Sequence, residues 1–179
     1  FIKLDSEIFT LYLLENSKQG CALKLDYADL KKLQTIQSLT IGGTAPDLLL
    51  YDDKKNAQSL HAYVKKNKYT IVFIWISWCA HCQKTVPKMN ALYEQYKKKG
   101  LGVFAISLDE EESKWKTALA AHQTTWLNVS ELVPLKQSKV AQNYSITTTP
   151  AIFILDKDGK IVAKNIYDEA LESFLKGRL

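Results

Sequence analysis

Two cysteines separated by two residues are the feature of this sequence with the clearest chemical meaning. Cys79-Ala80-His81-Cys82 follows an apolar run and opens an amphipathic stretch, so we expect it at the start of a helix. There, free backbone N–H groups and the positive end of the helix dipole lower the pKa of a thiol. A thiolate attacks disulfides, and a second thiol at this distance can resolve the mixed disulfide. The spacing predicts a redox-active dithiol, with Cys79 as the exposed nucleophile and Cys82 as the buried resolving thiol.

His81 lies between the two cysteines and adds a hydrogen-bond donor or a positive charge near the thiolate. Stabilising the thiolate favours the dithiol over the disulfide, which shifts the couple toward oxidising potentials. We therefore expect His81 to tune the chemistry of the pair.

Thr149-Pro150 comes directly before the apolar run Ala151–Leu155. Proline lacks an N–H, so it is either an ordinary first residue of a strand or a cis-proline in a deliberate turn. In the second interpretation Pro150 lies beside the dithiol, and Thr149 offers its backbone to an extended polypeptide. Together with Trp78, these two residues form the expected substrate-binding surface.

Two non-redox interpretations of the cysteine pair compete with this chemistry. A zinc site needs four ligands, and the remaining candidates are Cys21, His61, His81 and His122, with no second close spacing among them. A structural disulfide across two residues closes a small loop and stabilises little. We therefore expect no metal, and disulfide exchange needs no organic cofactor.

Composition restricts the class of protein. The 179 residues are 46% hydrophobic and 24% charged, enough for a sizeable core, which excludes a disordered chain. The longest apolar runs, such as 69–78, are about half of the roughly 20 residues that a membrane-spanning helix needs. The net charge is +5, but every cation except Arg178 is lysine, whereas nucleic-acid recognition favours arginine. No nucleic-acid partner is expected.

From Thr44 onward short apolar runs alternate with amphipathic stretches, which indicates an α/β sheet covered by helices. The expected strands are Asp47–Leu50, Tyr69–Ile76, Leu101–Ser107, Thr125–Val129, Ala151–Leu155 and Lys160–Ala163, the last two joined at the turn Asp156–Gly159. Three expected helices are Ala80–Lys99 with a kink at Pro87, Leu135–Tyr144 and Asp168–Lys176. A fourth is capped by Ser107 or Asp109 and reaches about Ala121. Its first turn contains Glu110, Glu111 and Glu112.

These predicted elements divide the chain into two regions. Residues 1–40 are predicted as a helical extension or the tail of an upstream domain, and residues 41–179 as the main domain. Because the chain begins at Phe1 rather than Met, we expect targeting information upstream of it.

Four features together resemble thioredoxin: the expected strand Tyr69–Ile76, the motif Trp78-Cys79-Ala80-His81-Cys82, Pro87 and the segment Thr148-Thr149-Pro150. Three further segments are similar to the TlpA/ResA branch of thioredoxin-like thiol-disulfide oxidoreductases: Gly43–Asp47, Ile106–Asp109 and Ile154–Lys160. The resemblance covers about residues 41–175.

This resemblance implies a mixed sheet of four or five strands flanked by helices, Cys79 as nucleophile, Cys82 as resolving thiol and a cis Pro150. It also implies protein thiols or disulfides as substrates and an upstream redox partner. Members are usually exported and often tethered to the membrane, so we expect an extracytoplasmic, periplasmic setting. Cys21 lacks the preceding apolar residue of a lipidation site and is expected to be an idle thiol.

The chain departs from the pattern at two acidic positions. Thioredoxin has a buried acid six residues before its first cysteine, where this chain has Phe73, and the ResA-like branch has a glutamate where this chain has Thr85. The proton acceptor for Cys82 is then water, Asp109 or a residue of the turn 110–112. The dipeptide Ala80-His81 leaves the direction of electron flow open.

Two other functions fit parts of the sequence. A peroxiredoxin shares the fold but needs a threonine shortly before a lone reactive cysteine, whereas Ser77-Trp78 precede Cys79. A non-catalytic binding module would use the groove around Trp78 and Pro150 to hold a partner chain. Oxidoreductase chemistry at Cys79 and Cys82 remains the leading interpretation.

Overall fold

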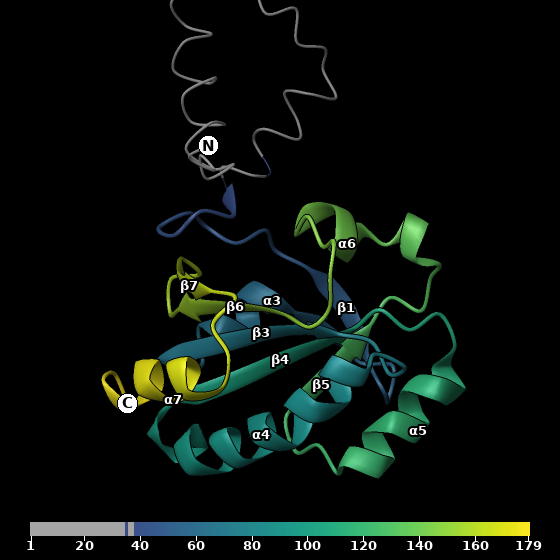
Figure 1. Cartoon of the computed structure of the whole chain (residues 1–179). Coiled ribbons are helices and arrows are strands. Elements are labelled where there is room, and N and C mark those ends of the chain that lie inside the picture. Colours follow the sequence, from purple (N-terminus) through teal and green to yellow (C-terminus); the bar gives the residue numbers. More distant parts are fainter. Residues whose placement is uncertain (1–34, 36–37) are drawn as a thin grey trace, which may run out of the picture.

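A computed structural model describes Thr35 and residues 38–179, which form one mixed sheet with helices on both faces (Figure 1). The strands are β1 Leu49–Asp52, β2 Ala57–Ser59, β3 Tyr69–Trp75, β4 Leu101–Ser107, β5 Leu127–Ser130, β6 Ala151–Asp156 and β7 Ile161–Lys164. Their order is β2-β1-β5-β4-β3-β6-β7, with β3, β4 and β5 parallel and the other pairings antiparallel. The α/β fold is confirmed, but the sheet has seven strands rather than four or five.

Five α-helices cover this sheet in the described part of the chain. They are α3 Leu60–Val64, α4 Ala80–Tyr96, α5 Glu112–His122, α6 Lys139–Asn143 and α7 Asp168–Lys176, with short 3₁₀ turns at Lys97–Lys99 and Leu135–Gln137. Figure 1 shows α4, α5 and α7 on one face and α3 and α6 on the other. The helices predicted at 80–99 and 168–176 are confirmed, the first ending in a 3₁₀ turn before Gly100.

Strand β3 shows why the sheet needs helices on both faces. Ile71, Phe73 and Trp75 belong to the apolar cluster under α4 and α7, while Val72 and Ile74 belong to the cluster under α3 and α6. Successive side chains of a strand point to opposite faces, so a run that is apolar at every position is buried on both sides. This central position fixes the end of β3, where the cysteine motif begins.

Two predicted helices differ from the structure. The helix expected from Ser107 or Asp109 begins only at Glu112, with Glu111 as its N-cap, so Glu112 alone of the three acids lies in its first turn. The helix expected over Leu135–Tyr144 is split, because Ser138 has extended dihedrals and its hydroxyl accepts the backbone N–H of Ala141. A serine in that conformation ends one turn and caps the next helix.

The segment before β3 contains elements that the sequence did not predict. The first strand lies two residues later than expected, at β1, and is followed by the hairpin partner β2 and by α3. Asp47, predicted as a strand residue, instead accepts the backbone N–H groups of Leu48 and His61, both at 2.9 Å. These bonds fix the entry of the chain into β1 and α3.

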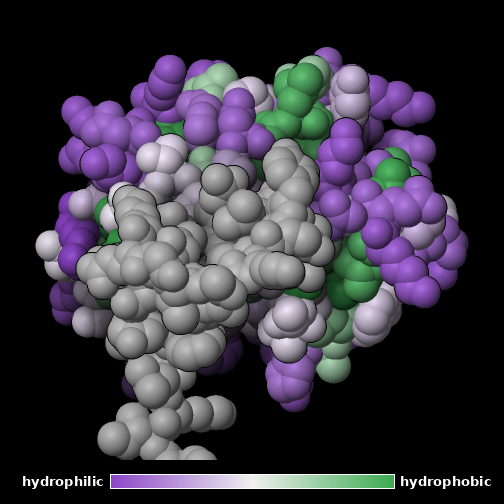
Figure 2. All heavy atoms as spheres, turned by 90° about the horizontal axis from the view of Figure 1, so that it is seen from above, coloured by the Kyte–Doolittle hydropathy of each residue, from purple (hydrophilic) through white to green (hydrophobic). Residues whose placement is uncertain are grey.

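The surface is mostly hydrophilic on the face seen in Figure 2, with smaller hydrophobic patches between the charged side chains. Large hydrophobic side chains that are exposed in the described region include Ile41, Leu49, Tyr51, Trp78 and Leu135. Among the described helices, none combines the length and the apolar character needed to cross a membrane. The helices predicted over residues 1–40 lie outside the described residues except for Thr35 and residues 38–40, and Cys21 lies outside them as well.

Candidate active site

The cysteine motif lies where β3 ends and α4 begins. Cys79 is the N-cap residue of α4, and its Sγ accepts the backbone N–H of Cys82 at 3.4 Å. An N-cap residue satisfies backbone N–H groups that have no partner inside the helix. Cys79 is partly exposed, Cys82 is completely buried, and both are free thiols.

The surroundings shift the pKa values of the two thiols in opposite directions. Partial burial acts to raise the pKa of Cys79, but hydrogen bonds from the Thr149 side chain, the Cys82 backbone and thiol and the His81 backbone hold it below its ordinary value of 9.0. Burial raises the pKa of Cys82 to about 12, and the Cys79 sulfur adds to the rise. Hydrogen bonds to a charged group favour it, whereas an apolar environment disfavours it.

The second half of the expected site lies beside the first. The Thr149–Pro150 peptide bond is cis, and β6 begins directly afterwards, pairing antiparallel with β3. The Cys79 thiol donates a hydrogen bond to the Thr149 carbonyl at 3.4 Å. Trp78 is 71% exposed at the same edge. The structure thus brings Cys79 and the cis-proline segment together, although 70 residues separate them.

His81 influences the Cys79 thiol through its backbone. Its side chain is exposed on the first turn of α4. Its backbone N–H is one of the groups that lower the pKa of Cys79, and its carbonyl accepts the Thr85 hydroxyl at 2.9 Å. The role expected of its imidazole stays a prediction.

The acids considered as proton acceptors for Cys82 point elsewhere. The carboxylate of Asp109 is buried and accepts hydrogen bonds from Ser77 and Ser107. Glu111 and Glu112 pair with lysines of α5 and Glu110 is exposed.

Tyr167 is a residue of the site that sequence reasoning missed. Its hydroxyl donates to the Pro150 carbonyl at 2.9 Å, and burial together with the Cys82 sulfur raises its pKa. It lies directly before α7, with no motif around it that marks it. Only the three-dimensional pairing of β6 and β7 brings it to the proline.

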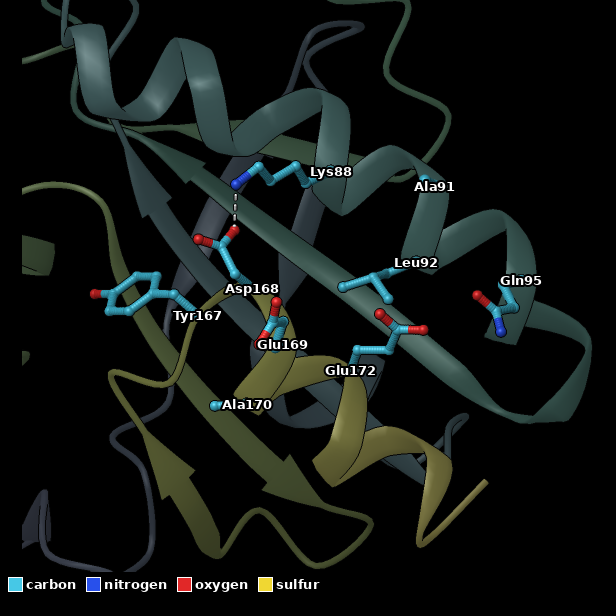
Figure 3. Close-up of a pocket in the computed structure, with 9 residues that line it drawn as sticks. All are labelled: Lys88, Ala91, Leu92, Gln95, Tyr167, Asp168, Glu169, Ala170 and Glu172. Atoms are coloured by element: carbon cyan, nitrogen blue, oxygen red, sulfur yellow. Dashed lines mark hydrogen bonds and ion pairs between the residues drawn. The ribbon is translucent and has the colours of Figure 1, made fainter.

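Tyr167 also lines a groove of about 740 Å³ between α4 and α7. Figure 3 shows the groove bridged by the ion pair of Lys88 and Asp168, 2.7 Å apart. Trp78, Cys79, Cys82 and Pro150 do not line it.

Comparisons with known proteins agree with this geometry. The family model described as the AhpC/TSA family matches residues 41–164. The thiol-disulfide oxidoreductase ResA of Bacillus cereus is 31% identical over 153 residues, which cover 84% of this chain and 82% of the relative. The chain belongs to the AhpC/TSA family and is a thiol-disulfide oxidoreductase.

Solved structures support the assignment of this oxidoreductase. A thiol-disulfide oxidoreductase from Bacteroides fragilis is 33% identical with a TM-score of 0.70, over 76% of this chain and 99% of that one. The thioredoxin domain of a thiol-disulfide oxidoreductase from Bacteroides vulgatus is 31% identical with a TM-score of 0.70, over 77% and 96% of the two chains. The fold and the class of enzyme expected from the sequence are confirmed.

Proposed function

We propose that this oxidoreductase exchanges disulfides with protein substrates through Cys79 and Cys82, with Cys79 as the attacking thiol and Cys82 as the resolving thiol. The observation that carries the proposal is the contrast between the two sulfurs. Cys79 is accessible with a lowered pKa, and Cys82 is buried with a pKa of about 12. Near neutral pH, Cys79 is the thiol with the greater thiolate fraction.

The reaction then proceeds in two exchanges. The Cys79 thiolate attacks one sulfur of a substrate disulfide, the substrate S–S bond breaks, and the departing sulfur leaves as a thiolate that takes up a proton. Cys82 then gives up its proton to solvent or to a departing thiolate and attacks Cys79 Sγ. The second substrate sulfur leaves, so the substrate gains two electrons and two protons and the enzyme becomes a disulfide. Oxidation of a substrate dithiol is the same sequence reversed.

Trp78, Thr149 and Pro150 form the proposed binding surface for the substrate chain. The exposed indole offers apolar area, and the backbone of Thr149 lies next to Cys79 Sγ. Backbone pairing with an extended peptide gives affinity without requiring a particular substrate sequence. Such a surface suits an enzyme that acts on several protein thiols or disulfides.

We also place the reaction outside the cytoplasm, in extracytoplasmic thiol redox homeostasis. The similarity to ResA supports this setting. An upstream redox partner protein would return the Cys79–Cys82 pair to its working state after each turnover. Cell fractionation followed by thiol trapping of the native protein would test the compartment and the redox state together.

Trapping of the mixed disulfide tests the roles of the two cysteines. Incubated with a disulfide-containing protein, Cys82→Ser should accumulate a covalent complex through Cys79, because the resolving thiol is missing. Cys79→Ser should form none, and the double variant serves as the control. Trapping by Cys79→Ser instead would reverse the two roles. A binding module would give a third result. Both single variants would still bind the partner, neither would trap it covalently, and the wild type would show no turnover.

A further inference from the structure

A buried carboxylate lies directly behind the loop that carries Cys79. Asp109 is 2% exposed and follows β4, two residues after Ser107. In the parallel pair of β3 and β4, Trp75 is opposite Ser107, so both strands end at the same edge of the sheet. Asp109 therefore reaches the segment that connects β3 to α4.

All the side-chain hydrogen bonds of Asp109 in the described structure go to two serines. Oδ1 accepts the Ser77 hydroxyl at 2.6 Å, Oδ2 accepts the Ser107 hydroxyl at 2.6 Å, and the Ser77 backbone N–H is 3.1 Å from Oδ2. Hydrogen bonds to an ionised carboxylate are shorter and stronger than neutral ones. In a buried position they are also protected from competition by water.

A third group completes the attachment of Ser77. The side-chain amide of Gln83, from the first turns of α4, donates to the Ser77 carbonyl at 3.0 Å. The N–H, hydroxyl and carbonyl of Ser77 are thus all engaged. We name Asp109, Ser77 and Gln83 the loop clamp.

The loop clamp holds the residue two positions before the reactive thiol. Cys79 Sγ lies 3.4 Å from both the Cys82 nitrogen and the Thr149 oxygen, and both contacts depend on where the loop places Cys79 at the start of α4. We propose that Asp109 is a positioning residue for Cys79, acting through Ser77, which Gln83 holds from the other side, to keep the Cys79 sulfur at the helix N-terminus. The inference rests on the proposed role of Cys79 as the attacking thiol.

The direction in which the pKa of Cys79 moves when Asp109 is replaced distinguishes positioning from a direct effect of charge. A negative carboxylate near a thiol disfavours the thiolate, so removing only the charge would lower the pKa of Cys79. Releasing the loop would weaken the hydrogen bonds to the sulfur and raise that pKa. Asp109→Asn keeps the size of the side chain, but it removes the charge and places an N–H₂ donor opposite the donors of the two serines.

The test is the pH profile of Cys79 alkylation by iodoacetamide, resolved from Cys82 by mass spectrometry. We expect Asp109→Asn and Ser77→Ala to move the midpoint to higher pH, with a rate at pH 7 at least about threefold below that of the wild type, because the thiolate is the reacting species. Gln83→Ala should give a smaller shift in the same direction. The double variant Asp109→Asn/Ser77→Ala should shift the midpoint no further than Asp109→Asn alone, since both changes disrupt the contact between Asp109 and Ser77.

Two controls are matched to these variants. Glu110→Gln removes an exposed charge one residue away and should leave the midpoint unchanged. Ser77→Thr keeps the hydroxyl and should stay near the wild-type profile. If Asp109→Asn does not fold, Ser77→Ala and Gln83→Ala decide the question.

An unchanged or lowered midpoint in the folded clamp variants would overturn the inference. The proposed function fails in a different way: wild-type Cys79 would then show no greater reactivity than Cys82 at neutral pH. The two failures are read from separate samples of the same experiment.

Discussion

At the scale of single residues, two identical side chains three positions apart acquire different chemistry. Cys79 is the N-cap of α4 and is surrounded by hydrogen-bond donors, whereas Cys82 is buried one turn into the helix. The first environment favours the thiolate and the second favours the thiol. The sequence predicted this pair from its spacing alone, because the helix N-terminus supplies the difference locally.

Replacing His81 by Ala tests the contribution of the imidazole. Loss of a positive charge or donor near the thiolate favours the disulfide, so the reduction potential of the Cys79–Cys82 couple should become more negative. Equilibration with glutathione redox buffers, quantified by thiol trapping, measures the change. Lys84→Gln, which removes an exposed cation from the same helix, is the control and should shift it less. Equal shifts would mean that His81 has no special role.

Tyr167→Phe tests the hydrogen bond that attaches the proline segment to the start of α7. Removing the donor to the Pro150 carbonyl should cost about 1 kcal/mol in the free energy of unfolding. Because burial raises the pKa of this phenol above its ordinary value of 10.0, the neutral form is favoured in the folded state. The advantage of the wild type is therefore complete below pH 10 and declines above it. Urea unfolding at pH 8 and pH 10.5 measures the difference, and an advantage that grows with pH would contradict the assignment.

At the scale of elements, the long regular segments could be predicted and the short ones could not. β4 and α7 lie at their predicted bounds, and the ends of β3 and β6 differ by one residue. β2 and α3 have three and five residues, too few for a pattern of period two or 3.6 to emerge. The start of α5 was misplaced because Asp109 binds Ser77, a contact across 32 residues, rather than capping the helix.

The same distinction holds for the site. Cys79, Cys82 and Pro150 belong to short motifs, so their types and spacing were enough to propose them as site residues, and that role stays a prediction. Tyr167 reaches Pro150 only after β6 and β7 pair, and no motif surrounds it. The contact of Cys79 with Thr149 also spans 70 residues, but the Thr149-Pro150 motif marked it, whereas nothing in the sequence marks the contact of Tyr167.

Pro87→Ala tests how much the proline inside α4 costs in stability. The helix runs through Pro87 from Ala80 to Tyr96, and proline there lacks the N–H that would complete the backbone ladder. Because Pro87 is exposed, alanine should fit and should raise the free energy of unfolding by about 1–3 kcal/mol. Urea denaturation of the reduced protein measures it.

Lys88→Ala is the control for Pro87→Ala. It breaks the exposed ion pair with Asp168 and should change the stability by less than about 1 kcal/mol. A loss of stability in Pro87→Ala would show that the proline is required for the packing of α4.

At the scale of the whole molecule, two apolar layers on either side of one sheet hold the reactive edge in place. The layer under α3 and α6 extends to Leu39, which is 5% exposed and lies before the predicted domain start at residue 41. Backbone bonds also join Gly42 and Gly43 to Ile161 of β7. The domain boundary itself remains a prediction.

Leu39→Ala tests whether the folded unit includes this residue. Loss of a buried leucine side chain should lower the free energy of unfolding by about 2–5 kcal/mol. Ile41→Ala is the matched control, because Ile41 is 65% exposed and its loss should change stability by no more than about 0.5 kcal/mol. Thermal and urea unfolding of both variants give the comparison, and equal small effects would place the start of the core after residue 41.

The most direct test of the account is the reactivity of each cysteine in the reduced wild-type protein as a function of pH. Mass spectrometry after brief alkylation resolves Cys79 from Cys82. The account predicts that Cys79 reacts with a midpoint below 9.0, while Cys82 stays unmodified until the pH approaches about 12. Equal reactivity at neutral pH, or earlier modification of Cys82, would contradict the assignment of Cys79 as the attacking thiol.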